Sequence, residues 1–201
     1  MKQIIFIHGG SCYPDNDAFC EALKMYIYNP FEEKKRWRNW LAEQVQGTYE
    51  VFKIEMPNKD MATYRAWKIW FEKSFDYLND DDLILVGHSL GVFFLCKYLS
   101  ENGFPKKIKQ LHLVSGLIDD QDLPPEEKYI GDFGFDIKKL SEIQNYADNI
   151  FLYHSTDDTC VPYQQTVRIQ ELLPKAKLTT FSDRGHINQP EFPELLENIV
   201  K

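Results

Sequence analysis

The chain has 201 residues, of which 43% are hydrophobic, 14% aromatic and 27% charged, values that argue for a globular protein and against a disordered or fibrous one. Lys and Arg together number 23 against 31 Asp and Glu, so the net charge is −8. This sign argues against nucleic-acid binding and against binding to anionic membrane surfaces.

Short apolar runs alternate with helical patterns along the chain. We expect strands at 4–7, 50–54, 83–86, 110–114, 150–153 and 177–181. We expect helices at 17–28, 32–46, 62–78, 90–101, 137–147, 163–173 and 191–200. Several of the runs are rich in Ile, Val, Leu and Phe without strict alternation, which is typical of strands buried on both faces of a parallel sheet. The order predicts a single α/β domain over 1–201, with about six mainly parallel strands and helices on both faces.

The cysteines do not have the spacing of a metal site or a redox motif. They are Cys12, Cys20, Cys96 and Cys160. We expect all four to be reduced thiols, which fits a cytoplasmic protein. The apolar run at 4–7 is too short for the core of a signal peptide, and no run approaches the length of a membrane span.

The most informative segment is 87–91, Gly-His-Ser-Leu-Gly, which has the pattern G-x-S-x-G. It follows the apolar run at 83–86 and opens a helical pattern, as does the nucleophile elbow of hydrolases. A sharp, strained turn at this place holds the serine hydroxyl clear of the sheet. Ser89 is therefore the candidate nucleophile. The alternative is an ordinary strand–helix turn in which the serine has no chemical role.

A serine hydroxyl needs a base, and in this class of motif an acid and then a histidine follow the serine along the chain. The acid candidates Asp157 and Asp158 follow the fifth expected strand, and His186 follows the last. An imidazole, with an ordinary pKa of about 6.5, suits transfer of the Ser89 proton to the leaving group. The acid would hold the imidazole of His186 in the tautomer that can accept this proton. Taken alone, His186 could equally be a surface-turn residue.

The choice between the two aspartates depends on spacing. Asp158 stands three positions before Val161-Pro162, where hydrolases of this type place the acid, so we favour Asp158. Asp157 is then expected to cap or brace the loop.

An oxyanion hole needs two backbone N–H donors. Leu90, the residue after the nucleophile, is expected to supply one of them. The other is expected from the loop after the first strand, where glycines let the backbone approach a substrate oxygen. Gly10 is the first choice in this loop and Ser11 the second, while His8 is expected to brace the loop.

These motifs resemble the α/β-hydrolase superfamily, in particular small serine hydrolases of the YdeN and retinoblastoma-binding-protein-nine type. The resemblance spans most of the chain and is weakest over 11–46 and 116–135. It implies a three-layer fold with a minimal lid, no cofactor, and carboxylesterase-like cleavage of small acyl esters by Ser89, Asp158 and His186. The retinoblastoma-binding motif L-x-C-x-E is absent, so no protein partner is inferred from the resemblance.

Other functions of the same residues stay open at this point. A thioesterase, an amidase or a peptidase could use the same triad, and a hydrolase fold could serve as a protein-binding module. The segment 13–37 is longer than a minimal member of the family needs and is expected to cover part of the pocket. No His/Asp/Glu spacing indicates a metal.

Several aromatic residues are expected to be structural. The tryptophan pairs 37/40 and 67/70 are each spaced to share one helix face and are expected in the core. His112 and His154 are expected to be buried and hydrogen-bonded.

Overall fold

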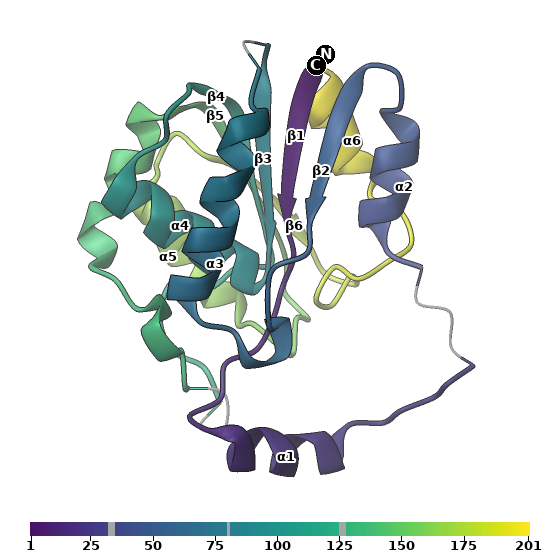
Figure 1. Ribbon diagram of the computed structural model, residues 1–201, viewed down its shortest axis with the longest axis vertical. Helices are drawn as coiled ribbons and strands as arrows, with labels where there is room; N and C mark the ends of the chain where they lie inside the picture. Colours follow the sequence, from purple (N-terminus) through teal and green to yellow (C-terminus); the bar gives the residue numbers. More distant parts are fainter. Residues whose placement is uncertain (32–34, 80, 125–127) are drawn as a thin grey trace.

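The computed structural model describes residues 1–31, 35–79, 81–124 and 128–201. Six parallel strands form one sheet in the order β2-β1-β3-β4-β5-β6. The strands are β1 Lys2–Ile7, β2 Tyr49–Ile54, β3 Leu83–His88, β4 Ile108–Val114, β5 Ala147–Ser155 and β6 Lys177–Phe181. The predicted α/β architecture, a parallel sheet of six strands with helices on both faces, is confirmed (Figure 1).

The helices divide between the two faces of the sheet. The α-helices are α1 Asn16–Met25, α2 Trp37–Gln44, α3 Tyr64–Glu72, α4 Leu90–Asn102, α5 Tyr163–Leu172 and α6 Pro193–Val200. The 3₁₀ segments are η1 Lys59–Met61, η2 Lys73–Tyr77, η4 Gly131–Phe133 and η5 Ile137–Asn145. Helices α3, α4 and α5 cover one face, and α2 and α6 cover the other (Figure 1).

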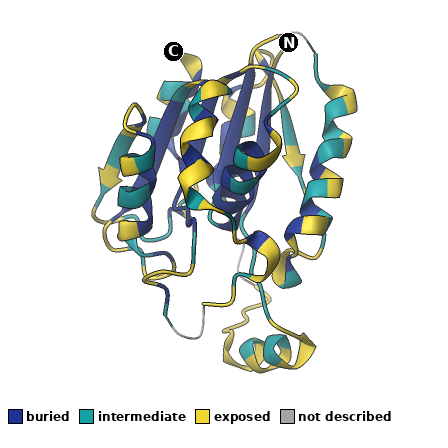
Figure 2. Ribbon diagram, turned by 90° about the vertical axis from the view of Figure 1, so that its left-hand side faces the viewer, coloured by how far each residue is buried: buried dark blue, intermediate teal, exposed yellow. Residues whose placement is uncertain are grey.

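Alternation along the central strands builds two separate cores. In β1, Ile5 and Ile7 belong to the core under α3, α4 and α5, whereas Ile4 and Phe6 belong to the core under α2 and α6. This follows from the two-residue period of a strand, which sends successive side chains to opposite faces. The sheet is therefore buried on both sides between the two helical layers (Figure 2).

The helical segments differ from the sequence-based expectation in three places. The expected helix at 62–78 is α3 followed by the 3₁₀ turn η2, where the Ser74 hydroxyl donates to the Phe71 carbonyl and competes with the helical ladder. The expected helix at 137–147 is the 3₁₀ segment η5, whose buried Leu140 and Ile143 are three residues apart, the 3₁₀ period. Helix α2 begins at Trp37, and 32–34 of the expected helix lie outside the described residues.

Of the four tryptophans expected in the core, three pack in or against it, Trp40 from a half-buried position. Trp37 and Trp67 are buried. Trp40 is half-buried, and Trp70 is 47% exposed, so the prediction of a core position for Trp70 is wrong. The face of α3 that meets the core is defined by Trp67 and Phe71, which are four residues apart, and Trp70 is rotated away from that line.

Helix α1 lies apart from the sheet, on the side of the carboxyl ends of the strands (Figure 1). It contains no buried residue. Within the described ranges, no helix is both long and apolar enough to cross a membrane.

Candidate active site

Ser89 lies at a sharp turn between β3 and α4. Its backbone has φ +56° and ψ −123°, in the left-handed region that a non-glycine residue rarely adopts. Its amide donates to the Val114 carbonyl at 2.9 Å, which ties the turn to β4. A Cβ on Gly91 would lie 2.3 Å from the Ile7 carbonyl oxygen, so only glycine allows α4 to approach β1 this closely.

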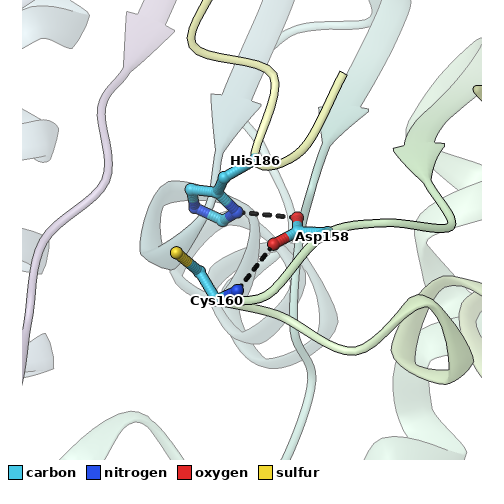
Figure 3. Close-up of side chains that lie close together, drawn as sticks. All are labelled: Asp158, Cys160 and His186. Atoms are coloured by element: carbon cyan, nitrogen blue, oxygen red, sulfur yellow. Dashed lines mark hydrogen bonds and ion pairs between the residues drawn. The ribbon is translucent and has the colours of Figure 1, made fainter. Parts of the chain in front are cut away.

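Asp158 and His186 lie together, as Figure 3 shows. The Nδ1–H of His186 donates to Asp158 Oδ2 at 2.7 Å. The second carboxylate oxygen, Oδ1, accepts from the amides of Cys160 at 2.8 Å and Val161 at 3.0 Å. The Asp158 side chain is fully buried, whereas that of His186 keeps 13% exposure. The acid is therefore fixed in the protein, and the imidazole ring reaches the surface of the site.

The environment of Asp158 favours its charged form. Burial is the largest influence and by itself raises the pKa of a carboxyl group. Hydrogen bonds from His154 and His186, the charge of His186 and the amide of Val161 act in the opposite direction and prevail. The pKa of Asp158 therefore lies well below its ordinary value, and the group is an anion at neutral pH.

Asp157 braces the loops rather than contacting the imidazole. Its Oδ1 accepts from the Ser155 hydroxyl and from the Gly185 amide, the latter at 3.0 Å. Ser155 Oγ in turn accepts from the Arg184 amide at 3.1 Å. These hydrogen bonds lower the pKa of Asp157, and the bond from Ser155 has the largest effect. They also join the loop that carries Asp158 to the loop that carries His186.

His88, within the G-x-S-x-G segment, supports the loop that carries His186. Its Nε2–H donates to the His186 carbonyl at 3.0 Å, and the two ring centroids are 5.0 Å apart. Burial and, to a lesser extent, the neighbouring His186 lower the pKa of His88 to about 3, so His88 is neutral. The sequence reasoning assigned no role to His88, although its place inside the motif was the available signal.

The loop around His186 has two residues in the left-handed region. Gly185 has φ +49° and Ile187 has φ +46°, so the chain turns sharply on both sides of the histidine. The Trp37 indole N–H donates to the Ile187 carbonyl at 2.8 Å and anchors this turn to α2.

The backbone amides proposed for an oxyanion hole differ in what they already bind. The Ser11 amide donates to the Lys59 carbonyl at 2.8 Å, so the second-choice donor is engaged. The amides of Gly10 and Leu90 make no hydrogen bond to any described residue. Leu90 is the first residue of α4, where a helix leaves its amides without an internal partner.

Ser89 and His186 both line a cavity of about 620 Å³. No hydrogen bond joins the two side chains among the residues that the structure describes. In structures without substrate, catalytic hydrogen bonds are often long and tighten only in the complex.

The two sides of the cavity differ in polarity. Charged residues line it from α2 and from the segment after β2, and apolar residues line it from the segments after β4 and β5. The charged residues are Arg36, Arg38, Glu55, Lys59 and Asp60, and the apolar ones include Leu117, Leu123, Ile130 and Val161. Because β2 and β5 lie on opposite sides of β3 in the sheet, these charged residues lie toward β2 and these apolar residues toward β5. Tyr13 and Tyr26, from the long segment 13–37, also line it.

Three side chains of kinds that can bind a metal ion lie close together in this site. Ligand atoms of Asp158, Cys160 and His186 lie within 4.8 Å of one another (Figure 3). Both oxygens of Asp158 already accept hydrogen bonds, and its side chain is fully buried. This donor set therefore does not suit a metal ion.

The remaining histidines have structural environments. His8 accepts a hydrogen bond from the Met56 amide at 2.8 Å, and its Nδ1–H donates to the adjoining Gly9 carbonyl. His112 and His154 are fully buried and hydrogen-bonded at both ring nitrogens, as the sequence predicts.

A parallel sheet with a strained serine turn after β3, and with an aspartate–histidine pair on loops after β5 and β6, defines an α/β-hydrolase. The family model described as "Serine hydrolase" matches residues 29–197, and the chain belongs to this family.

Known proteins agree with this assignment. The chain is 27% identical over 168 residues to serine hydrolase RBBP9 of Rattus norvegicus, covering 82% of this chain and 84% of the relative. The structure of the ydeN gene product of B. subtilis superposes with a TM-score of 0.75 at 20% identity, over 100% of this chain and 97% of that one. A meta-cleavage product hydrolase of Pseudomonas fluorescens superposes with a TM-score of 0.69 at 14% identity, over 100% and 89% of the two chains.

Proposed function

We propose that this serine hydrolase is a carboxylesterase that cleaves small acyl esters, with Ser89 as nucleophile, His186 as general base and acid, and Asp158 as the residue that orients His186. The observation that carries the proposal is the 2.7 Å hydrogen bond between Asp158 and His186, beside a cavity that the strained Ser89 also lines. Asp158 fixes Nδ1 as the protonated nitrogen of His186, which leaves Nε2 able to accept a proton.

The reaction proceeds by acyl transfer. Ser89 Oγ attacks the ester carbonyl carbon while its proton passes to His186 Nε2. The oxyanion is stabilised by the amides of Gly10 and Leu90, which make no other hydrogen bond among the described residues. The C–O bond breaks, and the leaving alcohol takes the proton from His186. Water then attacks the acyl-enzyme by the same steps, which releases the acid and restores Ser89. No cofactor is required by this chemistry.

The substrate is a small molecule whose acyl part lies on the apolar side of the cavity. Leu117, Leu123 and Val161 offer a surface that a short alkyl or aryl acyl group would bury. The charged residues on the side of β2 suit a polar leaving group or solvent. A thioesterase, amidase or peptidase would use the same residues, and a protein-binding module would use none of them.

Labelling by a fluorophosphonate probe tests the proposal, with the wild type beside Ser89→Ala. We expect the wild type alone to be labelled. Turnover is then measured on p-nitrophenyl esters from acetate to octanoate and on thioester and anilide analogues. The comparison identifies the preferred leaving group and acyl length. A folded wild type that the probe does not label would overturn the proposal and favour the binding module.

We also propose a cytoplasmic location, because all four cysteines are thiols and none forms a disulfide. Fractionation of the source cells with an antibody against the chain tests this proposal, and recovery from the medium or the membrane pellet would contradict it.

A further inference from the structure

A second histidine contacts the proposed catalytic acid. His154 lies in β5 and is fully buried. Its Nε2 is 3.2 Å from Asp158 Oδ2 and 2.9 Å from the Val161 carbonyl oxygen. Its Nδ1 is 2.6 Å from Thr166 Oγ1, on α5. His154 therefore joins a strand, a helix and the loop that carries the acid.

The partners of His154 determine which ring nitrogen carries the proton. A carbonyl oxygen only accepts, so Nε2 must be protonated in order to bond Val161. The same nitrogen lies 3.2 Å from Oδ2 of Asp158, so its N–H bond places positive partial charge beside the carboxylate. In the neutral ring Nδ1 is then the acceptor, and it receives the hydroxyl of Thr166. The bonds to Val161 and to Thr166 on α5 thus hold the ring with its protonated nitrogen beside the acid.

The carboxylate of Asp158 accepts three hydrogen bonds, and the Nε2 of His154 is a fourth polar neighbour at 3.2 Å. Oδ1 accepts from two backbone amides, and Oδ2 lies between the imidazoles of His186 and His154. A second imidazole N–H this close to Oδ2 does two things. It fixes the position of this oxygen, and it withdraws negative charge from the bond to His186.

We propose that His154 is a positioning residue that holds Asp158 Oδ2 toward His186 and sets the strength of the Asp158–His186 hydrogen bond. The inference rests on the proposed function of this pair. The titratable groups that face His154 are Asp158, on the acid loop, and Tyr163, on α5. Those that face His186 are Asp158, His88 and the thiol of Cys160.

Two substitutions separate positioning from packing. His154→Phe keeps an aromatic ring and removes the donor, whereas His154→Gln keeps an N–H near the place of Nε2. We expect kcat and the rate of fluorophosphonate labelling to fall about tenfold in His154→Phe, with KM within twofold, well short of the loss of up to ~10⁴ for the acid itself. His154→Gln should stay within threefold of the wild type.

The pH profile supplies a readout that packing would not move. With one donor fewer on Oδ2, Asp158 interacts more strongly with a protonated His186, so the acidic limb of kcat/KM should move to higher pH in His154→Phe. His112→Phe is the matched control, because His112 is an equally buried strand histidine whose partners are Tyr153 and Gln110. His112→Phe should change neither kcat nor the acidic limb of the kcat/KM profile.

The ring of His154 can also be observed directly. In ¹⁵N spectra of the wild type we expect the Nε2 of His154 to carry a proton, and we expect the signals of this ring to change in Thr166→Val, which removes the bond to Nδ1. A proton on Nδ1, equal losses in His154→Phe and His154→Gln, or a His154→Phe protein with the wild-type profile would each overturn the inference. These outcomes differ from failure of the esterase proposal, in which the wild type itself would not react with the probe.

Discussion

Trp37 and Ile187 are 150 positions apart in the chain, and the indole N–H of the first donates to the carbonyl of the second at 2.8 Å. Ile187 has a left-handed backbone and adjoins His186, so this bond holds a strained turn in the loop that carries the imidazole. The Trp37 ring also meets Phe6, His88 and Phe192 at edge-to-face angles. The position of His186 therefore depends on the core beneath α2 as well as on Asp158.

Trp37→Phe should weaken this anchor. The phenyl ring keeps much of the packing but leaves the buried Ile187 carbonyl without its donor, which costs about 1–3 kcal/mol. We expect a lower midpoint of urea unfolding and a several-fold fall in kcat. Trp70→Phe, at an exposed position, is the control and should change neither quantity. Equal effects of the two substitutions would show that the Trp37 N–H does not hold the loop.

Asp158→Asn should lower kcat by up to about 10⁴, because the amide can no longer fix the tautomer of His186. Asp157→Asn should reduce activity far less, since Asp157 contacts Ser155 and Gly185 rather than the imidazole. Both variants are measured on the best p-nitrophenyl ester, with circular dichroism to establish folding. A larger loss in Asp157→Asn would contradict the assignment of Asp158 as the acid.

Gly91→Ala should prevent the serine turn from forming. The new Cβ would lie 2.3 Å from the Ile7 carbonyl oxygen and 2.8 Å from that of His8, and backbone atoms cannot move aside as a flexible side chain can. We expect loss of soluble protein or a cost of several kcal/mol, seen as a large drop in Tm. Gly47→Ala is the control, because a Cβ at this position would meet no atom within 4 Å. The backbone φ of +84° there should make the alanine only about 1 kcal/mol less stable than the glycine. Similar Tm values for the two variants would contradict this account.

The sequence predicts the sheet and the loops of the site well because both depend on local signals. Apolar runs that do not alternate indicate strands buried on both faces, and G-x-S-x-G after such a run indicates the turn at Ser89. The choice of Asp158 over Asp157 came from its spacing to Val161, and the structure places Asp158 against His186, while the Val161 amide bonds the acid.

Other features depend on contacts that no local pattern reveals. The bond from Trp37 to Ile187 and the contact of His154 with the acid arise only when distant segments pack together. The exposure of Trp70 and the 3₁₀ form of η5 likewise follow from which side chains the core accepts, and helical spacing alone does not determine this.

Stability should fall as the pH decreases below about 6.5, because burial lowers the pKa of three histidines, His8, His88 and His112. Burial lowers the pKa of His88 and of His112 to about 3, whereas in the unfolded chain both titrate near 6.5. Between these values the unfolded state binds protons that the native state does not, so each histidine contributes stability that is complete above pH 6.5 and decreases below it. At pH 5 the loss should reach about 2 kcal/mol for His88 and about 2 kcal/mol for His112.

Urea unfolding at pH 7.5, 6.5, 5.5 and 5.0 measures this dependence and avoids the range below pH 4.5, where the carboxylates begin to titrate. His112→Phe removes one of these groups, so its free energy of unfolding should start lower at pH 7.5 but decline less steeply than that of the wild type. A wild-type stability that is constant from pH 7.5 to 5.0 would show that these histidines accept protons in the folded protein. Identical slopes in the two proteins would show that the loss arises at other groups.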